Sequence, residues 1–191
     1  MTRVTIFGSG NMGTAIDSVL SAGGAEVEHI GSTDTTATVA GDIVILAVPY
    51  PALASIVATY GPQLAGKTVV DITNPLNFET FDSLTVPADS SAAAELAAAL
   101  PSAKVVKAFN TTFAATLGAK EVGPNKTTVL IAGDDADAKA TLAAAISAGG
   151  VDAVDAGSLS RARELEAVGF LQLTLAVGEK IGWTGGFGIV R

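Results

Sequence analysis

Three glycines near the N-terminus have the spacing of turns that bind phosphate groups. The segment Gly8-Ser9-Gly10-Asn11-Met12-Gly13 follows a hydrophobic run directly and opens a predicted helix. Glycine at the first position allows a tight turn, at the second lets a pyrophosphate approach the backbone, and at the third lets the helix pack against the strand. The phosphates then meet free N–H groups and the positive end of the helix dipole. In this context the motif predicts a dinucleotide-binding site.

The residues at the end of the second predicted strand bear on which dinucleotide is bound. An NAD site normally carries Asp or Glu there, bonded to the ribose 2′-OH. Here Ser32 and Thr33 occupy the place, and hydroxyls can donate to a 2′-phosphate that a carboxylate would repel. Against this, no Lys or Arg lies between Arg3 and Lys67, and Asp34 could turn inward to serve NAD. NADP is the favoured cofactor, and NAD is the alternative.

Three later strand ends have an unusual composition. They are the segments Ala47–Pro51, Asp71–Leu76 and Ala108–Thr112, which bring prolines, amides and hydroxyls. Ligands of open α/β sheets lie beyond the carboxyl ends of the strands. A proline after a strand is often only a stop signal, but three such ends on one edge favour a pocket for the nicotinamide ring.

The sequence lacks an obvious general acid or base for this pocket. Its single histidine, His29, lies on the second predicted strand and is expected to be a packed or edge residue. No Tyr-x-x-x-Lys pair occurs, and Glu164 and Glu166 lie on the last helix, where a solvated or interface position is the default. Reduction of a carbonyl usually needs proton transfer, whereas hydride exchange between two rings can depend on stacking and orientation alone. We therefore predict no catalytic side chain.

The elements that position these residues alternate between strand and helix patterns, which predicts an α/β fold with a doubly wound, mostly parallel sheet. The predicted strands are Arg3–Phe7, Glu26–Ile30, Ile43–Val48, Thr68–Ile72, Lys104–Ala108, Thr127–Ala132 and Val151–Val154, with an edge strand at Phe187–Val190. The predicted helices are Asn11–Ala22, Ala52–Tyr60, Ser91–Leu100, Ala136–Ala148 and Ser160–Lys180.

The second crossover of this fold is predicted to be shortened. Only ten residues lie between Gly31 and Asp42, and a full parallel crossover needs about a dozen or more. A loop or single turn should replace the usual helix and strand. We expect residues 1–191 to form one NAD(P)-binding Rossmann-like domain.

Composition excludes several classes of function. The net charge of −8 disfavours a nucleic-acid partner, which needs a basic face. The chain has no cysteine, so disulfides and thiolate metal sites are excluded and no metal site is expected. Its longest apolar stretch, Ala167–Val177, is too short to span a bilayer. The first strand starts at Arg3, which leaves no room for a signal peptide. These features predict a cytoplasmic protein without a membrane partner.

The last predicted helix, residues 160–181, is apolar around much of its circumference. A helix of this kind is buried on several sides. We predict that it forms a homodimer interface, with simple packing against the sheet as the alternative.

Several segments together resemble the deazaflavin (factor-420)-dependent NADP oxidoreductases. The cytosolic domains of the six-transmembrane metalloreductases are similar too. The resemblance rests on Ile6–Gly13, Leu46–Tyr50, Asp71–Leu76, Val105–Thr111, Asp155–Leu159 and Arg161–Glu166. It implies a single Rossmann-like domain, NADP(H) binding and commonly a homodimer.

The resemblance also implies roles for individual residues. Ser9 to Gly13 would hold the pyrophosphate and Ser32 would lie by the adenosine phosphate, although the family usually has Ser-Arg where this chain has Ser32-Thr33. Val48 and Pro49, after Ala47, would flank the nicotinamide. The ring and the acceptor would be bordered by Asn74, Pro75, Ala108 and Asn110.

The expected function is hydride transfer between NADP(H) and a planar small-molecule acceptor such as a deazaflavin or flavin. One alternative is a non-catalytic module that senses NADP(H). Another is reduction of a small imine or carbonyl compound, of the pyrroline-carboxylate type, which normally needs a further helical domain.

Overall fold

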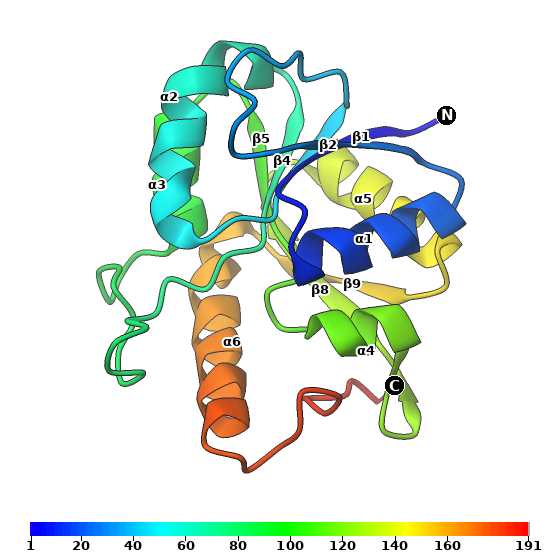
Figure 1. Cartoon of the computed structure of the whole chain (residues 1–191), viewed down its shortest axis with the longest axis vertical. Coiled ribbons are helices and arrows are strands. Elements are labelled where there is room, and N and C mark those ends of the chain that lie inside the picture. Colours follow the sequence, from blue (N-terminus) through cyan, green and yellow to red (C-terminus); the bar gives the residue numbers. More distant parts are fainter. Residues whose placement is uncertain (191) are drawn as a thin grey trace.

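The computed structural model describes residues 1–190 and is built on a seven-stranded sheet with helices on both faces (Figure 1). All neighbouring strands are parallel except β5 and β8, which are antiparallel. The strands lie in the order β2 (Glu26–Ile30), β1 (Arg3–Phe7), β3 (Ile43–Leu46), β4 (Thr68–Asp71), β5 (Lys104–Lys107), β8 (Thr128–Gly133) and β9 (Asp152–Gly157). A separate hairpin consists of β6 (Glu121–Val122) and β7 (Asn125–Lys126). The predicted fold class is confirmed.

Helices cover the two faces of the sheet in separate groups. On one face α1 (Asn11–Ala22), α4 (Ala114–Ala119) and α5 (Ala136–Ala148) pack over the strands, and their apolar residues form one core. On the other face α2 (Leu53–Leu64), α3 (Ala92–Ala99) and the start of α6 (Ala162–Val177) form a second core. Two short 3₁₀ helices, η1 (Tyr50–Ala52) and η2 (Leu159–Arg161), precede α2 and α6.

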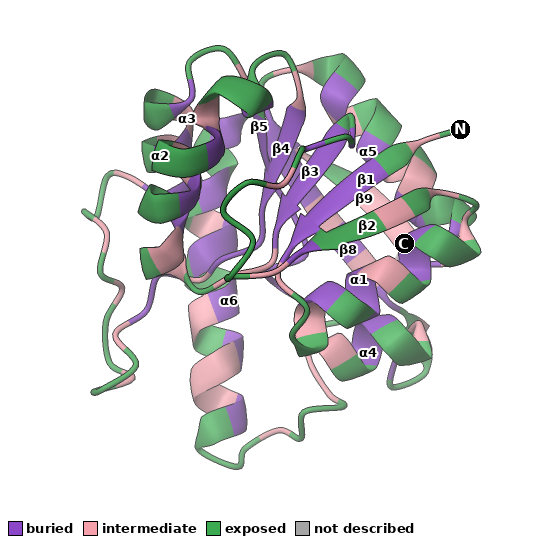
Figure 2. Ribbon diagram, turned by 45° about the horizontal axis from the view of Figure 1, so that its top comes forward, coloured by how far each residue is buried: buried purple, intermediate pink, exposed green. Residues whose placement is uncertain are grey.

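The central strands owe their position to continuous hydrophobic runs. Every residue of β3 and β4 is buried, as expected of parallel strands covered on both faces. Strand β2 lies at the edge and exposes most of its residues (Figure 2). The chain leaves β1 towards β2 on one side and returns to β3 on the other. The sheet order therefore reverses at the ends of β1 and β3, where open α/β sheets bind ligands.

The shortened second crossover is confirmed, since residues 31–42 contain neither helix nor strand. The segment is held by side chains of its neighbours. The Val39 N–H donates to Gln63 Oε1 at 2.9 Å, and the Gly41 N–H donates to Thr5 Oγ1 at 2.8 Å. A Cβ at Gly41 would lie 2.4 Å from the Thr5 nitrogen, so glycine is needed where the chain crosses β1.

The predicted edge strand at Phe187–Val190 is wrong. Residues 182–190 form no strand, and the Phe187 N–H donates to Gln172 Oε1 of α6 at 3.1 Å instead of joining a ladder. The chain turns at Gly182–Gly185, where the Gly185 N–H donates to the Gly182 carbonyl at 2.9 Å. A side chain of α6 thus captures the backbone that would have paired with a sheet edge.

Two further features are absent from residues 1–190. No helix in this range has the length and hydrophobicity needed to cross a membrane. Within the same range, no group of three or more His, Asp or Glu side chains is arranged to hold a metal ion.

Candidate functional site

The glycine-rich turn between β1 and α1 depends on the absence of two side chains. Gly8 has a φ of +102°, and a Cβ there would lie 2.3 Å from the Ala47 carbonyl oxygen. A Cβ at Gly13 would lie 2.6 Å from the Gly8 carbonyl oxygen, so helix α1 can start this close to the strand only with glycine. At Gly10, by contrast, a Cβ would meet no protein atom within 4 Å. The space in front of Gly10 is open to a ligand.

The N-terminus of α1 has the donors that an anion needs. Its N-cap is Gly10, with no side-chain hydrogen bond to the helix, and no acidic residue lies in the first turn. The first N–H groups of a helix have no partner within the helix and carry a partial positive charge. A diphosphate therefore fits this end of α1.

His29 braces the same turn from the edge strand. Its Nδ1 lies 2.9 Å from the Gly8 carbonyl oxygen, and its Nε2 lies 3.0 Å from Asp17 Oδ2 of α1. The histidine is an edge residue, as expected, and it links the turn to the helix.

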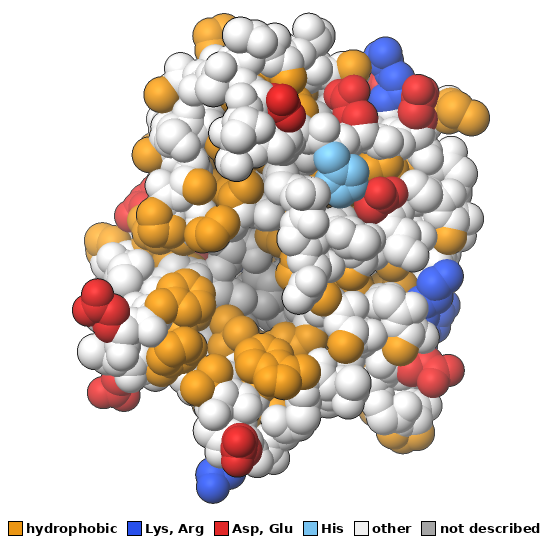
Figure 3. All heavy atoms as spheres, in the orientation of Figure 1, with side chains coloured by type: hydrophobic (Ala, Val, Ile, Leu, Met, Phe, Trp, Pro, Cys, Tyr) orange, Lys and Arg blue, Asp and Glu red, His pale blue; other side chains and the backbone are white. Residues whose placement is uncertain are grey.

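A cavity of about 370 Å³ opens beyond the ends of β4 and β5. Four of the predicted binding residues line it together, namely Asn11, Met12, Asn74 and Asn110. Its other lining residues are Ile72, Phe109, Thr112, Phe113, Ala114, Ala115, Leu173 and Trp183. Figure 3 shows hydrophobic side chains gathered around a hollow beside α6. None of the lining residues, all within the described range, is an acid or base at neutral pH.

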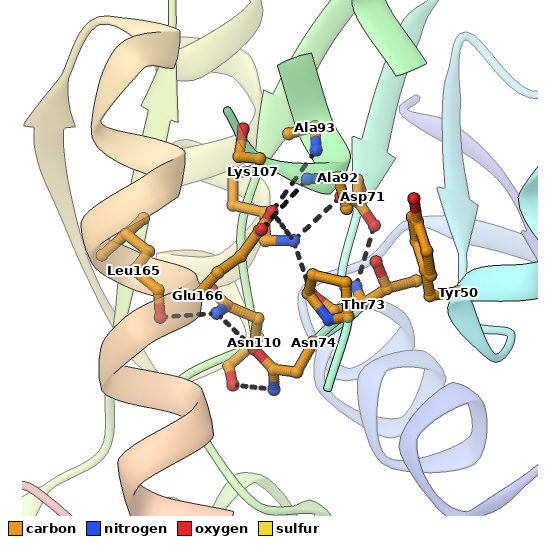
Figure 4. A network of polar contacts seen from close by, with 12 residues as sticks. Tyr50, Asp71, Thr73, Asn74, Ala92, Ala93, Lys107, Asn110, Leu165 and Glu166 are labelled. Carbon is orange, nitrogen blue, oxygen red and sulfur yellow. Dashed lines mark hydrogen bonds and ion pairs between the residues drawn. The ribbon is translucent and has the colours of Figure 1, made fainter. Parts of the chain in front are cut away.

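Two asparagines hold one border of this cavity. The Asn110 Nδ2 group donates to Asn74 Oδ1 and to the Leu165 carbonyl, both at 2.8 Å, and the Asn74 Nδ2 group donates to the Asn110 carbonyl at 2.9 Å (Figure 4). Helix α6 comes this close because Gly169 has no Cβ, which would lie 2.3 Å from Asn74 Oδ1.

One polar atom of this pair has no partner. Asn110 is 5% exposed, and its Oδ1 atom is buried without a hydrogen bond in residues 1–190. Such an acceptor costs free energy unless a ligand donates to it. The amide group of a nicotinamide is a donor of the required kind.

The remaining predicted residues lie at other points of the site. Val48 lies near Gly8, and Pro49 is exposed at the start of η1. Pro75 is buried, as is Ala108, whose N–H donates to the Asp71 carbonyl at 3.2 Å behind the cavity. The structure does not bring these four residues to the cavity lining.

The turn after β2 leaves two hydroxyls exposed. Ser32 and Thr33 are both exposed there. The Asp34 carboxylate accepts the Gly31 N–H at 3.0 Å, and the Asp34 carbonyl accepts the Tyr60 hydroxyl. The carboxylate is thus bonded to the turn itself.

A buried ion-pair network lies directly behind the asparagines, and the sequence did not predict it. Lys107 Nζ contacts Asp71 Oδ2 at 2.9 Å and Glu166 Oε1 at 2.8 Å, and it donates to the Thr73 carbonyl at 2.5 Å (Figure 4). The three charged side chains are 0% exposed. The expectation that Glu166 is solvated or at an interface is therefore wrong. One signal was available: Lys107 and Asp71 interrupt adjacent apolar strands and are register partners.

Glu166 also caps a helix on the opposite side of the network. Its two carboxylate oxygens accept the N–H groups of Ala92 and Ala93 at 3.0 and 3.3 Å, at the N-terminus of α3. Burial raises the pKa of Glu166, and the Lys107 ammonium opposes this shift. The network joins β4, β5, α3 and α6, and through Thr73 it fixes the backbone just before Asn74.

Comparison with known proteins places these features in one family. Residues 25–75 match the model of the coenzyme F420-dependent NADP oxidoreductases. The chain is 33% identical over 171 residues to the F420-dependent NADP reductase of Methanocaldococcus jannaschii, which covers 87% of this chain and 76% of that protein.

Two further relatives show how far the likeness extends. A crystal structure from Arthrobacter sp. FB24, described as an F420-dependent NADP reductase, superposes with a TM-score of 0.85 at 25% identity and covers 100% of both chains. The metalloreductase STEAP3 of Rattus norvegicus is 42% identical over 106 residues, which is 56% of this chain but 20% of that protein. By its identity to the Methanocaldococcus reductase along most of both sequences, the chain belongs to the F420-dependent NADP oxidoreductase family.

Proposed function

We propose that the chain transfers a hydride between NADP(H) and the deazaflavin F420. The observation that carries this proposal is a cavity with apolar walls and no acid or base, at the strand ends beside an uncapped helix N-terminus. Two flat rings can exchange a hydride there by stacking and orientation alone. The names of the relatives point to the same pair of substrates.

Each part of the cofactor has a proposed set of residues. The glycine-rich turn, Gly8 to Gly13, would bind the diphosphate, and the hydroxyls of Ser32 and Thr33 would lie by the adenosine phosphate. From the family resemblance, Ala47, Val48 and Pro49 would border the nicotinamide from the side of the glycine-rich turn, outside the lining of the cavity. Asn74 and Asn110 would orient it from the other, supported from behind by Pro75 and Ala108.

The reaction balances without a protein acid. Bound NADPH supplies a hydride, which carries two electrons, to oxidised F420, and one proton from solvent completes reduced F420. The side chains around the cavity orient the rings and exclude water from them. Met12, Ile72 and Leu173 are well suited to this, since they are apolar and line the cavity from α1, from the segment just after β4 and from α6.

The test is a stopped-flow assay with NADPH and a panel of oxidised F420, FMN, FAD and ferric chelates. We expect turnover with F420, seen as loss of absorbance from both substrates. NADPH binding without turnover of any acceptor would contradict the proposal and favour a sensing module.

A single variant tests the diphosphate site. Gly10→Val should fold normally, because a Cβ there meets no protein atom within 4 Å. It should nevertheless bind NADPH at least about tenfold more weakly, because the side chain occupies the path of the diphosphate. Unchanged NADPH affinity in calorimetry would place the diphosphate elsewhere.

We also propose that residues 1–191 act as one NAD(P)-binding domain and form a homodimer through α6. One face of this helix is buried, whereas Val168, Leu171 and Val177 are 36%, 51% and 46% exposed. Val168 and Leu171 are three residues apart and so lie side by side on the helix surface, and neighbouring exposed apolar side chains on an ordered helix favour an interface. Light scattering should give a dimer mass for the wild type and a monomer mass for Leu171→Asp, and a monomeric wild type at micromolar concentration would refute the proposal. A cytoplasmic location stays a prediction.

A further inference from the structure

Trp183, the only tryptophan of the chain, reaches the cavity from the segment that follows α6. Its ring packs against Phe113, with the ring centroids 5.0 Å apart and the planes inclined by 56°. Phe113 is 8% exposed and Trp183 is 53% exposed. The pair therefore forms an aromatic wall that runs from the buried part of the cavity to solvent.

The backbone around Trp183 is held on both sides. On the N-terminal side, Glu179 adopts a left-handed φ of 58°, and the Lys180 N–H donates to the Leu175 carbonyl at 2.8 Å, so the chain reverses after α6. On the C-terminal side, the Gly182–Gly185 turn and the bond from the Phe187 N–H to Gln172 hold the segment.

Gln172 is itself well placed as the anchor. It is 2% exposed, and its Nε2 group donates to the Thr111 carbonyl at 3.2 Å, next to the strand end that borders the cavity. A half-exposed indole is thus held at the mouth of the cavity by a buried amide. Backbone hydrogen bonds hold Trp183 in place, so its indole need not be buried. The exposed face of the indole can therefore contact a ligand.

The mouth of the cavity is where a second ring would enter. Phe109 and Ile72, at 0% and 8% exposure, lie deeper. A nicotinamide with its diphosphate at the N-terminus of α1 would reach the part of the cavity lined by Met12 and the two asparagines. A second ring would then lie nearer to solvent, beside Trp183, which is 53% exposed.

We propose that Trp183, backed by Phe113, is the surface against which the acceptor ring stacks, and that this residue makes the site select flat multi-ring acceptors. The inference rests on the proposed function. Aromatic stacking needs an extended π face on the ligand. A small imine or carbonyl compound lacks that face and gains little from the indole, whereas a deazaflavin presents three fused rings.

The test compares Trp183→Ala, Trp183→Phe and a control, Phe187→Ala. Phe187 is 47% exposed on the same segment but is not among the residues lining the cavity. We expect Trp183→Ala to raise KM for F420 about tenfold with a smaller change in kcat. Trp183→Phe should recover most of this loss, and Phe187→Ala should match the wild type. The Kd for NADPH should change less than about twofold in all three variants.

A second readout follows binding without turnover. Oxidised F420 added to protein saturated with NADP⁺ should quench the emission of the single tryptophan, with a midpoint near the KM for F420. The Phe187→Ala variant should show the same quenching, and Trp183→Phe supplies the blank.

The outcomes separate this inference from the proposed function. If the wild type reduces F420 but Trp183→Ala keeps its KM, or if saturating F420 leaves the emission unchanged, the inference fails and the proposed function stands. If the wild type does not reduce F420, the proposed function fails, and the stacking surface for that acceptor fails with it.

Discussion

At the scale of single residues, Lys107 supports the site without lining the cavity. It is a fully buried cation with two buried carboxylates, which hold β4, β5, α3 and α6 together behind Asn74. Breaking such a group by removing one partner leaves charge buried without compensation. The same strand begins with Lys104, whose ion pair with Asp135 is largely exposed, so one strand offers both the test and its control.

Lys107→Met should lower the free energy of unfolding by about 3–5 kcal/mol, because Asp71 and Glu166 lose their counter-ion. Lys104→Met should change it little, because exposed ion pairs contribute little. Urea unfolding at neutral pH measures both variants.

The loss in Lys107→Met should also depend on pH. Burial raises the pKa of Glu166 above its ordinary value, so the stability linked to its protonated form is present at acid pH and is lost as the pH rises through the raised value. Without the Lys107 ammonium the pKa of Glu166 should rise further, so Lys107→Met should lose more stability than the wild type between acid and neutral pH. If Lys107→Met and Lys104→Met have the same free energy of unfolding at neutral pH, then Lys107 is not needed to compensate the buried carboxylates of Asp71 and Glu166.

Tyr50 gives a spectroscopic prediction. Its hydroxyl donates to Glu95 Oε2 at 2.5 Å, and this bond, with some burial, raises the pKa of Tyr50 to about 12. The contribution of the bond to stability is therefore present below pH 10 and is lost as the pH rises through about 12. Glu95→Gln should lower the Tyr50 pKa towards 10.0. Alkaline ultraviolet titration in a Tyr60→Phe background, where Tyr50 is the single tyrosine, measures the shift. Equal titration curves for the proteins with Glu95 and with Glu95→Gln would contradict the prediction.

At the scale of elements, the site depends on how closely two helices approach the strand ends. Helix α1 starts against β1 because Gly13 has no side chain, and α6 meets the Asn74–Asn110 pair because Gly169 has none. Both approaches put backbone or amide groups where a cofactor would lie. A Cβ at either glycine would push a helix away from the cavity.

Gly13→Ala should destabilise the protein and weaken NADPH binding together, because its Cβ would lie 2.6 Å from the Gly8 carbonyl oxygen. Gly118→Ala in α4 is the control. A Cβ there meets no atom within 4 Å, so we expect a gain of about 0.5–1 kcal/mol from helix propensity and normal binding. Thermal unfolding and calorimetry measure both variants. A Gly13→Ala protein with wild-type stability would mean that α1 tolerates displacement.

At the scale of the whole molecule, the sheet topology brings the parts of the site together. The order reverses between β1 and β3, and the parallel strands β1, β3, β4 and β5 end at one edge. The turn, the asparagine pair and the cavity lie along this edge, although their residues come from segments as far apart in sequence as Gly8 and Trp183. Cofactor binding should therefore stabilise the fold as a whole.

Saturating NADPH should raise the melting temperature more than NADH at equal concentration, because stabilisation tracks affinity. A ligand at about 100 times its Kd adds about 2.7 kcal/mol to the free energy of unfolding. Differential scanning fluorimetry with NADP⁺, NADPH, NAD⁺ and NADH measures the order. Equal or larger shifts with NADH would mean that Asp34, not Ser32 and Thr33, governs the ribose end.

Local features of the sequence were sufficient for most of the fold. Strand–helix alternation, the spacing of Gly8, Gly10 and Gly13, and the short segment between Gly31 and Asp42 each depend on a few neighbouring residues. For that reason the mostly parallel sheet, the turn at α1 and the shortened crossover were predictable. The antiparallel direction of β8 relative to β5 was not, because it follows from how distant segments pair.

The amino-acid sequence by itself determined the sheet, its glycine-rich turn and the strand ends that face a ligand. Only the tertiary structure decided that Glu166 is buried against Lys107, that Gln172 captures the last segment in place of a sheet edge, and that Trp183 reaches the cavity. The physical reason is range. Backbone propensity and hydrophobic periodicity act over a few residues. The ion pair between β5 and α6, and the hydrogen bonds of side-chain amides on α6 to the C-terminal segment, form only after folding has brought their atoms within about 3 Å of one another.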